Sequence, residues 1–189
     1  MKLSIKAGMI FTVITVFFGV TYYNNAELAK ELLEVYLPQI EELIQEDGSV
    51  DWIKLMLNNI FACAQAVGMG IVPLLFLPIF VLLSNAIMTG AVFGLGTAEA
   101  GMDPIKSFVF GILPHGIFEL TGLFISIALG YYLCRYMTRR LFRRPQEGTL
   151  LDILNAVAKI YVTVVLPLLI VASAIECFVT PEIMAWAGL

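Results

Sequence analysis

The only histidine of the chain, His115, lies four residues before Glu119 in the segment PHGIFE. That spacing places both side chains on one face of a helix. An imidazole and a carboxylate so placed could ligate a metal ion, take part in proton coupling or hold two helices together. An ionisable group inside a membrane costs roughly 2.5–3.5 kcal/mol, so the pair indicates a functional or interhelical polar site.

The composition predicts that this segment lies in a membrane. Of all residues, 60% are hydrophobic and only 14% are charged, and the mean hydropathy is +0.91. Because about 20 apolar residues cross a bilayer, the chain has room for about five crossings and little else. We therefore expect an all-α polytopic membrane protein, one membrane domain over residues 1–189, without a soluble catalytic or nucleic-acid-binding domain. The expected spans are residues 7–22, 52–70, 72–96, 112–134 and 150–178.

Prolines interrupt two of these spans. Pro167 is expected to kink the fifth, because its missing amide breaks the helical ladder. Before the fourth span, Asp103 can cap a helix that begins at Pro104. Pro114 and Gly116 then predict either a re-entrant half-helix over residues 104–113 or a simple kink in one long helix.

Basic residues predict the orientation in the membrane. Five arginines follow the fourth span and two lysines precede the first, so a count of five spans places both groups on the same side. We expect that side to be the cytoplasm, which holds the N-terminus, with the C-terminus outside. The arginines should also contact anionic lipid headgroups: Arg135, Arg139, Arg140, Arg143 and Arg144.

The segment between the first two spans, residues 24–51, is rich in glutamate and aspartate. By the same count it lies outside the cytoplasm. Apolar residues recur in it at helical spacing on either side of Pro38, which predicts two short amphipathic helices on the outer surface.

Polar residues of separate spans are expected at one depth in the outer half of the membrane. They are His115, Glu119, Glu176, Asn58, Asn59 and Asn85. Helix packing could bring them into one site that locks the helices or receives a partner. A proton-coupled or ligand-binding site is a second reading, and a zinc enzyme is a third that lacks the usual pair of histidines. We favour the first reading, and we expect no enzymatic activity, metal ion or cofactor.

Small residues in the third span offer a close-packing surface. Such a surface could pair two copies of the chain in a homodimer, or it could pack helices within one copy. The residues concerned are Gly90, Ala91, Gly94, Gly96 and Ala98.

Three motifs of this chain resemble the stage II sporulation protein M family. They are Asn58-Asn59, residues 111–119 (GILPHGIFE) and residues 175–181 (IECFVTP). The resemblance covers about residues 50–185, while the first span and the acidic segment match only in general character. One departure is Asn85-Ala86, where the family often has Asn-Gly.

The resemblance implies a non-enzymatic protein of the bacterial cytoplasmic membrane. In the family's namesake role, it would act in the engulfment machinery of sporulation as a scaffold that recruits peptidoglycan hydrolases for cell-wall remodelling. Its other partners would be membrane lipids, and no nucleic acid is expected. The alternative is a transporter or lipid-handling permease, which would need a cavity at the depth of the polar residues.

Overall fold

The computed structural model describes residues 2–45, 49–99, 101–145 and 148–189, without the side chains of residues 2, 39 and 40. Within these ranges the chain is helical and contains no strand, only an isolated antiparallel bridge between Ile44 and Val50. The elements are α1 (Lys2–Asn24), α2 (Ala26–Glu41), α3 (Trp52–Gly68), η1 (Met69–Ile71), α4 (Pro78–Glu99), α5 (Pro104–Lys106), η2 (Ser107–Ile112), α6 (Leu113–Leu141), α7 (Leu150–Ile160), η3 (Tyr161–Val165), α8 (Leu166–Phe178) and α9 (Thr180–Ala187).

Four helical stretches are long and apolar enough to cross a membrane: Leu3–Asn24, Pro78–Glu99, Pro104–Leu141 and Leu150–Phe178. The protein is therefore an all-α polytopic membrane protein, as the composition predicted. Helix α3 has 17 residues, which rise about 25 Å, and the 3₁₀ turn η1 extends it. A membrane crossing by α3, and with it the count of five, stays a prediction.

The third span does not begin where the sequence suggested. Residue 72 was expected to open it, but α4 begins at Pro78, and the chain reverses direction over the residues before it. Leu74 and Phe76 adopt positive φ angles of 72° and 47° in this reversal. The reversal is attached to α6, because the Leu74 amide donates to the Thr138 hydroxyl at 2.9 Å.

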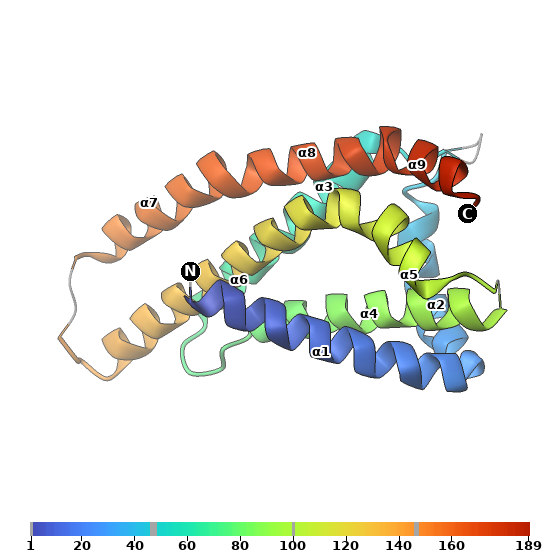
Figure 1. Cartoon of the computed structure of the whole chain (residues 1–189). Coiled ribbons are helices and arrows are strands. Elements are labelled where there is room, and N and C mark those ends of the chain that lie inside the picture. The colour runs from blue at the N-terminus through green and yellow to red at the C-terminus, as the bar shows by residue number, and fades with distance from the viewer. Residues whose placement is uncertain (1, 46–48, 100, 146–147) are drawn as a thin grey trace.

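Helix α1 packs along α4, and α6 packs against α3 and α8 (Figure 1). A Cβ atom at Gly90 would lie 2.9 Å from the Thr15 carbonyl oxygen, and one at Gly94 would lie 2.7 Å from the Gly19 carbonyl oxygen. The small residues of α4 thus let α1 approach within the same chain, which is the second of the two uses considered above. The homodimer stays a prediction.

The prediction of two short helices in the acidic segment is wrong. One helix, α2, continues through Pro38 to Glu41, and Ile44 beyond it pairs with Val50 instead of forming a second helix. Pro38 has no amide to donate to the Glu34 carbonyl, so α2 continues through it without one backbone hydrogen bond. Helix α2 is joined to the bundle by Lys30, whose ammonium lies 2.6 Å from Glu99 at the end of α4. The hydrogen bond to Glu99, followed by that to Glu27, raises the pKa of Lys30.

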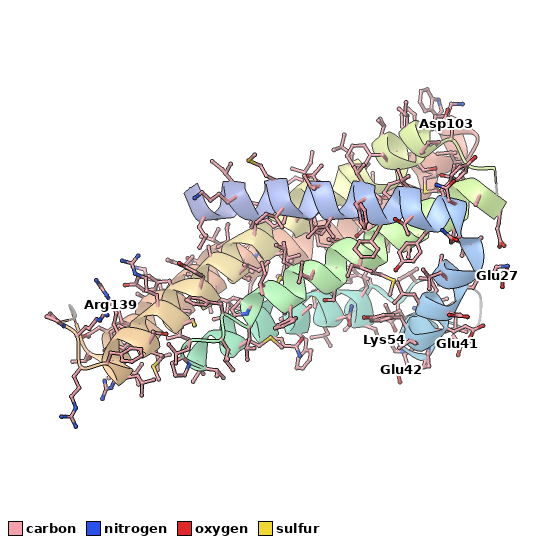
Figure 2. The ribbon with its side chains drawn as sticks, turned by 90° about the horizontal axis from the view of Figure 1, so that it is seen from below. Glu27, Glu41, Glu42, Lys54, Asp103 and Arg139 are labelled. Atoms are coloured by element: carbon pink, nitrogen blue, oxygen red, sulfur yellow. The ribbon has the colours of Figure 1, made fainter. Side chains whose placement is uncertain are left out.

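Charge is divided between the two ends of the bundle. Arg139 lies at one end, whereas Glu27, Glu41, Glu42 and Asp103 lie at the other (Figure 2). The side chains of all five arginines named above are exposed.

Two π-helical turns introduce the bends of the structure. In η2 the Leu113 amide donates to the Phe108 carbonyl, and in η3 the Leu166 amide donates to the Tyr161 carbonyl. Each turn ends two residues before a proline, Pro114 or Pro167. A proline ring clashes with the carbonyl four residues earlier, and the wider π turn moves that carbonyl aside.

Residues 104–112 form a helical segment that points in a different direction from α6 (Figure 1). Asp103 caps this segment as predicted, since its carboxylate accepts from the amides of Ile105 at 2.9 Å and Lys106 at 3.2 Å. The segment bends through η2 and continues into α6, so residues 104–141 form one long bent helix, which is the second of the two possibilities considered above. A re-entrant path of this segment in the membrane stays a prediction.

Candidate functional site

His115 and Glu119 lie in the first two turns of α6, immediately after the bend at η2. The i,i+4 spacing places them on one face, about 6 Å apart along the axis. The bend directs this face toward the C-terminal part of α8. Local helix geometry therefore sets the pair, and the π turn sets the direction in which it points.

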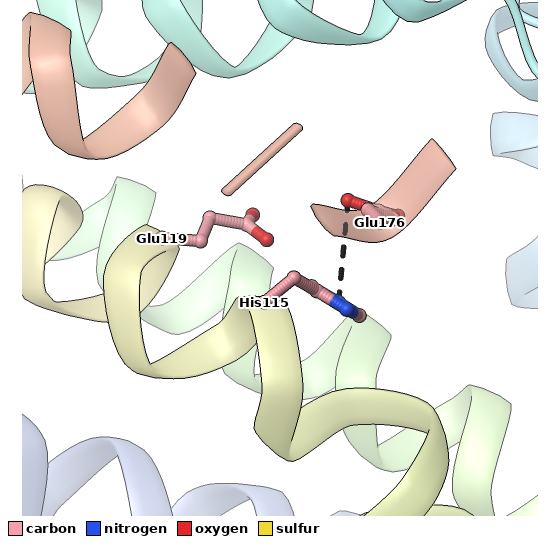
Figure 3. Close-up of side chains that lie close together, drawn as sticks. All are labelled: His115, Glu119 and Glu176. Carbon is pink, nitrogen blue, oxygen red and sulfur yellow. Dashed lines mark ion pairs between the residues drawn. The ribbon is translucent and has the colours of Figure 1, made fainter. Parts of the chain in front are cut away.

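Glu176 of α8 completes a three-residue cluster (Figure 3). His115 Nε2 lies 4.0 Å from Glu176 Oε2, and the two side chains are 12% and 33% exposed. One donor atom from each of His115, Glu119 and Glu176 lies within 4.8 Å of the other two. A nitrogen and two carboxylate oxygens at this spacing could hold a divalent metal ion or share protons.

Thr180 orients the histidine ring, a role that sequence reasoning missed. Its hydroxyl lies 3.3 Å from His115 Nδ1, and the residue is only 5% exposed. Thr180 opens α9, and α9 packs against η2. The sequence did contain a signal for this role. Thr180 follows Glu176 by four residues, within the motif of residues 175–181, so helical spacing would place the two side chains on one face.

The model of the family described as stage II sporulation protein M matches residues 8–181, from α1 into α9. The chain belongs to the stage II sporulation protein M family. This match extends the resemblance proposed from the motifs, because it includes α1 and α2 as well as residues 50–181.

A protein of Methanocaldococcus jannaschii, described as uncharacterized, is 26% identical to this chain over 92 residues. The matched segment covers 49% of this chain and 51% of that protein. The alignment therefore spans about half the length of this curated relative. No solved structure matches the chain.

The three asparagines of the predicted cluster lie in different surroundings in the structure. Asn85 lines the same pocket as His115 and Glu119, but its amide donates to the Val81 carbonyl of its own helix at 2.8 Å. Asn59 is buried on α3, and its Nδ2 has no hydrogen-bond partner among the described residues. Asn58 is exposed on the same helix. The two neighbours differ because consecutive residues point about 100° apart on a helix, and the part of each asparagine in the cluster stays a prediction.

A pocket of about 610 Å³ lies between α1, α4 and the bent segment from α5 to α6. Its lining is mainly apolar, with Phe11, Val16 and Phe93 among the residues. Its residues with polar groups are Thr12, Thr15, Tyr23, Asn85, Thr89, Thr97, His115 and Glu119. The histidine and one glutamate of the cluster thus face a space that could admit a small ligand or water.

Proposed function

We propose that this protein is a non-enzymatic membrane scaffold that recruits cell-wall-remodelling enzymes, namely peptidoglycan hydrolases, as in the engulfment complex of sporulation. The observation that carries the proposal is the family match over residues 8–181. A scaffold needs a surface that projects from the membrane, and α2 with its exposed acidic side chains provides one at the end of the bundle opposite the arginines.

In this proposal the arginine-bearing end faces the cytoplasm and binds anionic lipid headgroups. The N-terminus is then cytoplasmic, and α2 and the C-terminus face the outside, where peptidoglycan lies. The cluster of His115, Glu119 and Glu176 locks α6 to α8, or it receives a transmembrane helix of the partner.

Site-specific photo-crosslinking in the native host tests recruitment. A crosslinking amino acid replaces Val35 of α2, which is 71% exposed, and the matched control replaces Leu151 of α7, which is 65% exposed. We expect mass spectrometry to identify a peptidoglycan hydrolase joined to position 35 but not to position 151. Crosslinks from α2 to lipid alone, or to no cell-wall enzyme, would contradict the proposal.

The second candidate is a transporter or lipid-handling permease, and the pocket of about 610 Å³ favours it. A pocket with mainly apolar walls and a few polar groups suits an amphiphile. Native mass spectrometry of protein extracted in mild detergent should then detect a bound lipid. Gly19→Leu places a larger side chain in the pocket wall and should remove that lipid, whereas Gly68→Leu, at an open position with no atom within 4 Å, should not.

A further inference from the structure

We infer that His115, Glu119 and Glu176 form a binding site for one divalent transition-metal ion, of which zinc matches the donors best. This inference replaces the expectation from the sequence that the protein binds no metal ion. It is independent of the recruitment proposal, because it concerns the contact between α6 and α8 in the protein itself.

The donor set and its spacing carry the inference. Zinc is bound by imidazole nitrogen and carboxylate oxygen at about 2.0–2.2 Å, so the donors of a tetrahedral site stand about 3.3 Å apart. His115 Nε2 and Glu176 Oε2 are 4.0 Å apart, and all three donors lie within 4.8 Å of one another. Metal binding would therefore draw the three donors closer together, and both glutamates have side-chain torsions that can rotate.

The histidine is already oriented as a metal ligand. Metal-binding histidines almost always donate the second ring N–H to an oxygen atom, which fixes the ring and its tautomer. Thr180 Oγ1, at 3.3 Å from Nδ1, is placed to accept that hydrogen bond. With the proton on Nδ1, the lone pair of Nε2 points toward Glu176 and into the cluster.

A bound cation would also balance the charges of the cluster. Over the parts of the chain that are described, neither Glu119 nor Glu176 forms an ion pair with a lysine or arginine, and Glu119 has no hydrogen-bond partner. Buried charges are normally paired or bound to metal. One divalent ion with two carboxylates and a neutral imidazole gives a complex of zero net charge, which suits an apolar interior.

A route for the ion exists. His115 and Glu119 line the pocket between α1, α4 and α6, so an ion and a water molecule acting as fourth ligand could enter from it. Many zinc sites have three protein ligands and leave the fourth coordination position open to water. Bound metal would join α6 to α8 directly.

The full chain in detergent, with any histidine tag removed, is stripped with chelator and then titrated with Zn²⁺ or Co²⁺. We expect one ion per chain by inductively coupled plasma mass spectrometry. For the Zn²⁺ form, X-ray absorption should show only nitrogen and oxygen ligands, with imidazole among them. Metal far below one ion per chain, or a sulfur ligand from a cysteine, would overturn the inference, and both readouts use the unmodified protein.

Substitutions then assign the ligands. Glu119→Gln and Glu176→Gln keep the side-chain shape and should weaken binding by at least tenfold, and Thr180→Val should weaken it by roughly tenfold to a hundredfold through the histidine. Two neighbouring controls, Cys177→Ser and Glu182→Gln, should bind as the unmodified protein does. Equal affinity in all of these variants would mean that the metal binds elsewhere.

Discussion

The histidine is the residue at which three segments meet. Its Nδ1 faces Thr180 at the start of α9, and its Nε2 faces Glu176 near the end of α8. Glu119, on the same face of α6, completes the cluster. Each side chain alone would be costly to place inside a bilayer, so the contacts among them are expected to contribute to stability.

A double-mutant cycle of His115→Ala and Thr180→Val measures one of these contacts. We expect both variants to unfold more easily in mixed micelles, with a coupling energy of about 0.5–1.5 kcal/mol for the hydrogen bond. Thr121→Val is the control, because the Thr121 hydroxyl donates to the Ile117 carbonyl of its own helix. Fully additive effects of His115→Ala and Thr180→Val would show that the hydrogen bond is not formed.

At the scale of elements, two kinds of local feature shape the bundle. The π turns η2 and η3 bend the helices just before Pro114 and Pro167, and glycines allow backbones to touch. A Cβ atom at Gly130 of α6 would overlap the Ala66 carbonyl of α3 and would lie 2.8 Å from the Pro78 ring. Bends thus set helix direction, and glycines set helix separation.

Pro114→Ala tests the origin of the bend. Without the proline ring, the amide of residue 114 can donate to the Phe110 carbonyl, and we expect η2 to become ordinary α-helix. Spin labels at Ile105 and Tyr132, in a background without native cysteines, should then report a longer distance by electron–electron double resonance. Pro104→Ala, at the first position of α5, should leave the distance unchanged. An unchanged distance in Pro114→Ala would assign the bend to tertiary packing.

Gly130→Ala tests the close approach of α3 and α6. The new methyl group meets backbone atoms that cannot rotate away, so we expect a loss of about 1–3 kcal/mol in the free energy of unfolding. Gly68→Ala is the matched control, because no atom lies within 4 Å of its added Cβ. That control should be neutral or stabilising by up to about 1 kcal/mol, as alanine is the better helix former. Similar losses in both variants would contradict the packing shown here.

At the scale of the whole molecule, charge is divided along the bundle. Arginines occupy one end, and α2 with its glutamates occupies the other (Figure 2). By the positive-inside rule, the arginine-bearing end is the one expected to face the cytoplasm.

Single cysteines in intact cells test the orientation. We expect Val35→Cys on α2 to react with a membrane-impermeant maleimide from outside, because the acidic end is proposed to face outward. Arg143→Cys, after α6, should react only after the membrane is made permeable. The reverse pattern would invert the proposed topology, and reaction of both from outside would refute a crossing between them.

Much of this protein follows from sequence because helices are local structures. Hydrogen bonds between residues four apart, together with apolar length, predicted the all-α membrane fold, and the i,i+4 rule paired His115 with Glu119. Asp103 predicted the cap that opens α5. The prediction of a second helix in the acidic segment failed because Pro38 does not separate two helices: α2 continues through it to Glu41, and Ile44 pairs with Val50.

The tertiary structure decided how close distant segments come. Only packing could show that Glu176 lies 4.0 Å from His115, that Thr180 holds the ring, and that Asn58 is exposed. The structure also shows that Gly90 and Gly94 contact α1 of the same chain. The physical reason is that a helical pattern states which residues share a face. Which neighbour that face meets depends on bends, crossing angles and backbone approach, and these depend on contacts across the whole chain.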